Sequence, residues 1–109
     1  MASVYSSLLL LLPSSSNEQQ TQVPDSDIIV IRDVSGVFNL GVLFSVDVEI
    51  SPDQATWYSV YRASNEAGAP GFHQEMRVVV PPGFWIRAIS GGGPGSASCA
   101  VSGYVLSTP

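Results

Sequence analysis

Residues Met76 to Leu106, MRVVVPPGFWIRAISGGGPGSASCAVSGYVL, decide the fold class of this chain. Two breaker segments, Pro81-Pro82-Gly83 and residues 91–95, divide the stretch into three runs rich in β-branched and aromatic residues. The runs are too short for helices, and the last two alternate with a period of two. In the final run one face carries Ala97, Cys99, Val101, Gly103 and Val105. We therefore predict three consecutive strands here, arranged as a β-meander.

The same alternation of runs and breakers continues upstream. Residues 40–51 alternate apolar with polar side chains, and Ser51-Pro52-Asp53-Gln54 predicts a turn, so residues 40–62 should form a β-hairpin. Further turns are predicted at residues 24–27 and from Ser35-Gly36 onward. The other predicted strands span residues 4–12, 18–23, 28–34 and 72–80. The count and spacing predict an all-β chain, a single antiparallel β-sandwich of about eight strands, of jelly-roll rather than immunoglobulin type.

The N-terminal residues 1–13 include five consecutive leucines, Leu8 to Leu12, and end at Pro13. A signal peptide is the minor alternative, because no lysine or arginine precedes the leucines and no cleavage-like site follows. The run is also too short to cross a bilayer. We interpret residues 1–13 as an extended strand or arm and residues 14–109 as the sandwich domain. A strand with leucine on both faces is predicted to be buried on both faces, and a neighbouring subunit could bury one of them.

Charge is scarce in this chain. Charged residues make up 12% of the 109, there is no lysine, and the formal net charge is −5. A folded chain of this size should expose roughly 5,800 Å². So few charges on that surface favour burial of part of it against copies of the chain or a partner. The alternative is a soluble sandwich coated with serine and threonine. The negative charge argues against nucleic acid or an anionic membrane as partner.

Residues with catalytic or metal-binding chemistry are few. His73 is the only histidine and no nucleophile elbow surrounds a serine, so a surface or interface role is favoured over catalysis. Cys99 is the only cysteine; it should be a small buried side chain in a chain that folds under reducing conditions. Asp25 and Asp27 fit a turn better than a calcium site. We expect no enzyme activity, no cofactor and no metal.

Aromatic residues give the best case for a binding surface. Trp57, Tyr58, Tyr61 and Trp85 lie in or beside predicted strands. Packing in the core or a subunit interface is the favoured interpretation. A glycan-binding platform and exposure without a role are the alternatives.

Several motifs of the chain resemble a group of small virion proteins of tailed bacteriophages. The resemblance rests on the opening MASVYSSLLLL, the segments TQVP and IIVIRDVSG, the later HQEMRVVVPPGFWIRA and the closing VSGYVLS. In that group a Met-Ala-x-x-Tyr-x-x-x-Leu start precedes a Val-Pro-x-Gly turn and a strand ending in Arg-Asp-Val. Two segments depart from the pattern: residues 24–27 replace Pro-x-Gly, and Glu75-Met76 stands where glycine often precedes the arginine.

The resemblance implies a non-enzymatic structural protein of a virion that is assembled in the host cytoplasm. A capsid decoration or minor head protein is the leading expectation, and a head–tail, tail or fibre component that binds carbohydrate or a receptor is the alternative. Expected partners are copies of the chain, for example in a trimer, and the major capsid or other virion proteins. The expected interface comprises Tyr5, Leu8, Leu9, Leu10, Leu11, Leu12, Trp57, Tyr58 and Trp85.

Overall fold

The computed structural model describes residues 3–13, 17–38, 45–64, 71–91 and 97–107, with side chains from residue 6 onward. Within these residues every regular element is a strand, as the sequence predicts. The strands are β1 (Ser3–Leu12), β2 (Glu18–Gln22), β3 (Asp27–Phe38), β4 (Ser45–Ser51), β5 (Tyr58–Ser64), β6 (Gly71–Val80), β7 (Trp85–Ser90) and β8 (Ala97–Ser107).

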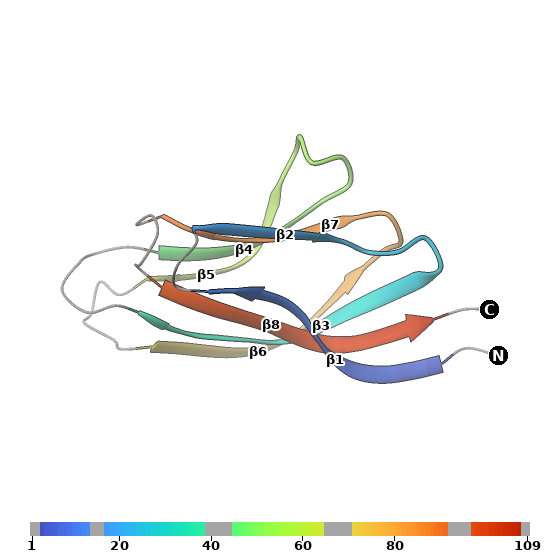
Figure 1. The fold of residues 1–109 in the computed structure, drawn as a ribbon, viewed down its shortest axis with the longest axis horizontal. Helices are drawn as coiled ribbons and strands as arrows, with labels where there is room; N and C mark the ends of the chain where they lie inside the picture. The colour runs from blue at the N-terminus through green and yellow to red at the C-terminus, as the bar shows by residue number, and fades with distance from the viewer. Residues whose placement is uncertain (1–2, 14–16, 39–44, 65–70, 92–96, 108–109) are drawn as a thin grey trace.

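The strands form two four-stranded antiparallel sheets, in the orders β1-β8-β3-β6 and β2-β7-β4-β5, which lie as two layers (Figure 1). The predicted antiparallel β-sandwich is therefore confirmed. The pairing is nested: β1 pairs with β8, β2 with β7, β3 with β6 and β4 with β5. Eight strands paired in this way are typical of a jelly roll, which remains our interpretation of the topology.

The predicted meander between residues 76 and 106 is wrong. The strands exist, but β6 and β8 belong to one sheet and β7 to the other. Only β4 and β5 are consecutive in the chain and adjacent in one sheet, which confirms the hairpin predicted there over its described residues. The other connections cross between the layers. Breaker residues mark where a strand ends, but they do not tell which sheet the next strand joins.

Strand β3 is longer than predicted. It continues through Ser35-Gly36, where we expected a turn, and ends at Phe38. Glycine is required at position 36 because a Cβ atom there would collide with the Ser98 carbonyl oxygen and the Phe72 ring. This glycine therefore allows close packing within a strand and does not mark a turn. The predicted turn at residues 24–27 is confirmed by a hydrogen bond from Asp27 N to Pro24 O of 3.0 Å.

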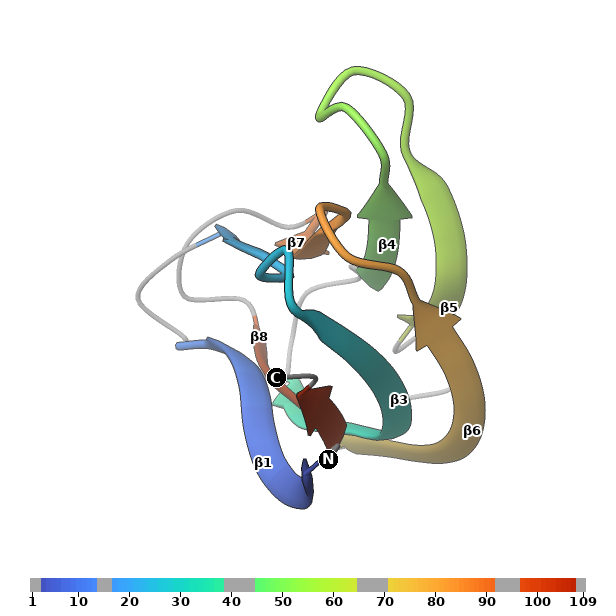
Figure 2. The same cartoon turned by 90° about the vertical axis from the view of Figure 1, so that its right-hand side faces the viewer.

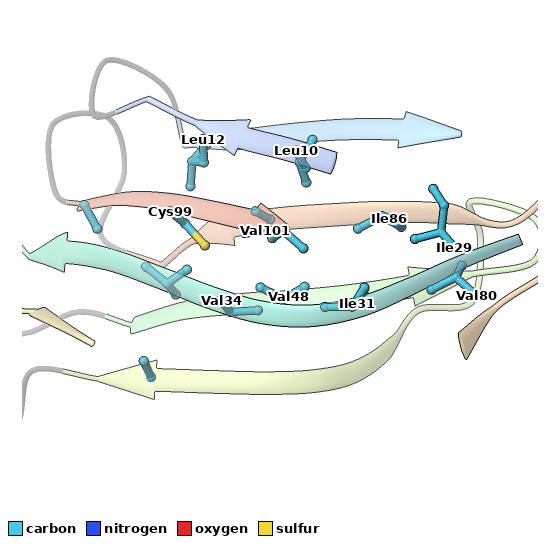
Figure 3. Close-up of a cluster of buried hydrophobic side chains, with 14 of the residues drawn as sticks. Leu10, Leu12, Ile29, Ile31, Val34, Val48, Val80, Ile86, Cys99 and Val101 are labelled. Carbon is cyan, nitrogen blue, oxygen red and sulfur yellow. The ribbon is translucent and has the colours of Figure 1, made fainter. Parts of the chain in front are cut away.

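The core lies between the sheets, with both layers contributing apolar side chains (Figure 3). The alternation predicted for β8 is confirmed, since Cys99 and Val101 point inward and are buried. In β7, Ile86 and Ala88 are buried, whereas Trp85 and Arg87 belong to the opposite face. The predicted alternation of residues 40–51 holds over β4, where Val46 and Val48 are buried. Its first part lies outside the described residues.

The N-terminal strand β1 is an edge strand of the β1-β8-β3-β6 sheet, and its partner β8 belongs to the same chain. Ser3 lies opposite Ser107, so the two ends of the described chain are neighbours (Figure 1). A register shift between Leu8 and Leu10 marks a bulge at Leu9. On the other sheet, the turn that joins β4 to β5 stands out from the body of the sandwich (Figure 2).

Candidate interaction surface

Exposed apolar side chains gather on one sheet. Among the described residues seven large apolar side chains are exposed, and six of them belong to β1, β8, β3 and β6. Each has a chain neighbour that packs in or against the core, so the alternation along the strand points the six outward. We call the outer surface of this sheet the apolar face. Its exposed large members are Leu8, Leu11, Ile28, Val37, Val79 and Tyr104.

The strand register places small and polar residues between these apolar side chains. Tyr104 lies between Ser6 and Val30, and Val30 lies beside Val79. Further along the sheet, Leu8 is opposite Ser102 and Leu11 is opposite Ala100. The exposed fractions of Leu8 and Leu11 are 57% and 53%. The outer face of the other sheet has one such side chain among its described residues, Tyr58, so the exposed large apolar side chains are concentrated on the apolar face.

A hollow lies near the middle of the apolar face. Its volume is about 430 Å³, and its lining includes Ser6, Ser7, Arg32, Asp33, Ser102, Gly103 and Tyr104. It forms where the register of β3 shifts between Ile31 and Asp33, so that Arg32 is the extra residue of a bulge in the pairing of β3 with β8. We call it the central hollow. Its polar lining contrasts with the apolar side chains on both sides of it.

The two charged residues of the hollow have different neighbours. The Arg32 guanidinium carbon lies 5.4 Å from the centre of the Tyr104 ring, a cation–π contact. Asp33 Oδ1 lies 2.6 Å from His73 Nε2, within ion-pair distance. That contact lacks the direction of a hydrogen bond, so Oδ1 is buried without a hydrogen-bond donor among the described residues. The Asp33 carboxylate is therefore close to the His73 ring, but its Oδ1 atom is buried from water without a hydrogen bond.

On the outer face of the other sheet, Arg87 contacts two carboxylates and an aromatic ring. Arg87 Nη2 and Nε donate hydrogen bonds to Glu49 Oε1 at 2.6 and 2.9 Å. Its guanidinium carbon lies 4.0 Å from the centre of the Trp57 ring, and its Nη1 lies 3.9 Å from Glu18 Oε2. The Trp57 indole nitrogen donates to Gln54 O at 3.1 Å. The polar groups of Arg87, Glu49 and Trp57 therefore have partners within the protein.

The structure divides the leucines predicted for the interface. Leu10 and Leu12 are buried in the core of the protein, so the expectation that they face a partner is wrong. Leu9 is half-buried at the β1 bulge and packs against the core. Leu8 and Leu11 are exposed on the apolar face. The Tyr5 side chain lies outside the described residues.

The predicted aromatic residues belong to the opposite sheet and the turn before it. Trp85 is half-buried on the outer face of β7, and Trp57 is half-buried beside Arg87. Tyr58 is exposed on the edge strand β5. None of the three joins the apolar face. The sequence signal for that face is the set of apolar residues on the outward sides of β1, β3, β6 and β8, but only the strand pairing, which the sequence does not reveal, brings them together.

Reactive groups are sparse in the described part of the chain. His73 contacts Asp33 on an exposed edge strand, and Cys99 is buried as expected. Burial raises the pKa of the Cys99 thiol to about 12, so the thiol stays protonated and unreactive at neutral pH. No group of three or more metal-ligating side chains occurs among the described residues. The structure contains no helix there that is long and apolar enough to span a membrane.

Comparison with known proteins adds information on the fold. No protein-family model and no curated protein matches the sequence. Among solved structures, the Drosophila NLP-core, described as a pentamer-forming and histone-binding protein, aligns with a TM-score of 0.60 and 17% identity over 94% of this chain and 96% of that chain. A mitogen from Yersinia pseudotuberculosis aligns with a TM-score of 0.33 and 8% identity over 100% of this chain and 88% of that one. At these identities the NLP-core match supports the sandwich fold alone.

Proposed function

We propose that this protein is a non-enzymatic structural subunit that associates with copies of itself through the apolar face. The observation that supports the proposal is the concentration of exposed apolar side chains on one sheet, led by Leu8, Leu11 and Val79. Burying such side chains against a second protein releases the free energy that their exposure costs, about 25 cal/mol per Å². The opposite sheet has no equivalent feature among its described residues, since its outer polar groups pair with one another.

The dimensions of the apolar face suit a protein interface. Four strands about 4.8 Å apart and about ten residues long, at about 3.3 Å per residue, span roughly 600 Å² in projection. The accessible area is larger because side chains roughen the surface, which brings it close to the roughly 800 Å² per partner of a standard complex. The whole chain exposes 5798 Å². Covering this face would therefore bury from water a substantial part of a surface that carries few charged residues.

The biological setting that we propose is the virion of a tailed bacteriophage, with a capsid decoration or minor head role as the leading possibility. This part of the proposal rests on the resemblance of the motifs quoted above. The pentamer named for the NLP-core indicates that a chain with this type of fold can assemble with its own copies. The alternative, a glycan-binding module built on Trp57 and Trp85, is less favoured because Trp57 packs on Arg87 and uses its indole nitrogen internally.

Association is tested with a pair of matched variants. Leu8→Ser combined with Leu11→Ser removes two exposed side chains from the apolar face, whereas Tyr58→Ser removes an equally exposed side chain, 57% in both Leu8 and Tyr58, from the other sheet. Size-exclusion chromatography with light scattering should show a lower mass for the leucine variant and an unchanged mass for the tyrosine variant. Equal masses for the unmodified protein and both variants would contradict the proposed face.

The virion assignment is tested separately by gene order. Genes for virion proteins of tailed phages should flank the gene for this chain, with capsid and portal genes nearby. A neighbourhood without any virion gene would contradict the assignment and leave self-association to be explained by another role.

A further inference from the structure

The bulge in β3 places opposite charges side by side on the apolar face. In a regular strand, consecutive side chains point to opposite faces, but the register shift between Ile31 and Asp33 disturbs this alternation. As a result Arg32 and Asp33 both line the central hollow. The protein thus presents one cation and one anion together, with apolar side chains beyond them on both sides.

Neither charge is neutralised by the other. Among the described residues Arg32 has no carboxylate within 4.0 Å, and its guanidinium group lies over Tyr104. Asp33 Oδ1 lies 2.6 Å from His73 Nε2 on the edge strand β6 but accepts no hydrogen bond among the described residues, and 40% of the Asp33 side chain remains exposed. A partner that covers the apolar face would desolvate both groups. Such burial is costly unless each charge gains an opposite charge from the partner.

We propose that the partner on this face is a second copy of the chain, related by a two-fold axis, and that Arg32 of each copy pairs with Asp33 of the other. This inference rests on the proposed self-association and specifies its geometry. In a two-fold contact, if residue i touches residue j of the partner, then residue j touches residue i of the partner. Adjacent opposite charges are self-complementary under that operation. One contact therefore satisfies both pairs of charges while the flanking apolar side chains are buried.

This geometry makes a dimer and no larger ring. A trimer, which the sequence analysis gives as an example, or a pentamer would use head-to-tail contacts between two different surfaces.

The experiment uses two variants with opposite charge. Arg32→Asp leaves two acidic side chains in the hollow, and Asp33→Arg leaves two basic ones. Each variant alone should dimerise at least about tenfold more weakly than the unmodified protein, because like charges meet across the axis. Mixed in equal amounts, the two should form a heterodimer, measured by native mass spectrometry at twice the protomer mass of 11.5 kDa. The double variant Arg32→Asp/Asp33→Arg should regain the homodimer.

A control pair and a milder pair complete the test. Arg62→Asp and Asp47→Arg reverse one charge each of the Arg62–Asp47 ion pair, which lies on the other sheet. Both should leave dimerisation unchanged. If circular dichroism shows that a charge-reversal variant is unfolded, Arg32→Gln and Asp33→Asn replace it, and each is expected to weaken the dimer about tenfold. Dimers that persist in both single variants, or a mixture without heterodimer, would overturn the reciprocal pairing.

The two proposals fail in different ways. If the Leu8→Ser/Leu11→Ser variant loses mass while the charge variants stay associated, self-association through the apolar face stands and the reciprocal pairing is wrong. A trimeric mass would likewise overturn only the two-fold contact. If the unmodified protein is monomeric at every concentration, both proposals are wrong.

Discussion

At the scale of single residues, Arg87 shows how this protein accommodates a largely buried charge although charged residues make up only 12% of the chain. Its side chain and that of Glu49 are both only 18% exposed. The guanidinium group lies with one face over the Trp57 ring and donates two hydrogen bonds from one edge to the Glu49 carboxylate. A charge in such a position stabilises the fold only as long as its partners remain.

Replacing Arg87 tests that dependence. Arg87→Ala leaves Glu49 without its cation and removes the support of Trp57, so the free energy of unfolding should fall by about 2 kcal/mol. The matched control is Arg62→Ala: its side chain is 68% exposed and lies 3.9 Å from Asp47, so the loss should stay within about 0.5 kcal/mol. Urea denaturation of both variants checks the difference. Equal losses would contradict the packing of Arg87 described above.

At the scale of elements, β1 combines two roles in adjacent residues. Leu12 is fully buried in the core, whereas Leu11 is exposed on the apolar face. The leucine run is therefore not uniformly exposed or uniformly buried. Three of the five leucines pack in or against the core, and the other two are exposed on the apolar face.

Two alanine substitutions in β1 should separate these roles. Leu12→Ala creates a cavity in the core and should lower the free energy of unfolding by about 3 kcal/mol. Leu11→Ala should lower it by less than about 1 kcal/mol while weakening self-association. Both are measured by urea denaturation at one low protein concentration, since association itself adds apparent stability. A large stability loss in Leu11→Ala at that concentration would contradict the outward orientation of Leu11.

The turn between β4 and β5 is ordered by two side chains. Ser51 Oγ accepts hydrogen bonds from the backbone nitrogens of Asp53 and Gln54 at 3.2 and 2.8 Å. Asp53 Oδ1 accepts them from Ala55 N and Thr56 N at 2.8 and 2.9 Å. The Thr56 and Ala55 N–H groups hold the pKa of Asp53 below its ordinary value of 3.8. The turn can thus adopt one shape although it stands out from the sandwich (Figure 2).

A pH prediction follows from the lowered pKa of Asp53. A carboxylate whose pKa is depressed by folding stabilises the folded state at pH values above 3.8, and that contribution is lost as the pH falls through its folded pKa. Asp53→Ala should therefore be less stable at neutral pH and should lose less stability on acidification. Thr56→Ala keeps the backbone N–H donor and should retain the normal acid dependence. Thermal denaturation from neutral to strongly acidic pH checks this; parallel curves for Asp53→Ala and the unmodified protein would contradict it.

The sequence predicted the strands better than their arrangement. The alternation in β4, β7 and β8 gave the buried faces correctly because one face of each strand packs on the core. The meander failed because pairing depends on contacts far apart in the chain. The same limit hid the central hollow, since the bulge that brings Arg32 beside Asp33 is defined only by the register of β3 with β6 and β8.

At the scale of the whole molecule, the two outer faces of the sandwich divide their chemistry. The β2-β7-β4-β5 face satisfies its own charges, as the contacts of Arg87 show. The apolar face leaves large apolar side chains exposed and one pair of opposite charges without mutual pairing. This asymmetry is typical of a subunit with one side toward a partner and one toward solvent. It is the main physical reason for interpreting the protein as a self-associating structural subunit.

Sedimentation velocity of the unmodified protein, from low micromolar to near-millimolar concentration at neutral pH, tests this interpretation most directly. We predict a mass that rises with concentration from the 11.5 kDa of one chain to at least twice that value. A single species of 11.5 kDa at every concentration would contradict the account, because the apolar face would then be exposed to water without a copy of the chain to cover it.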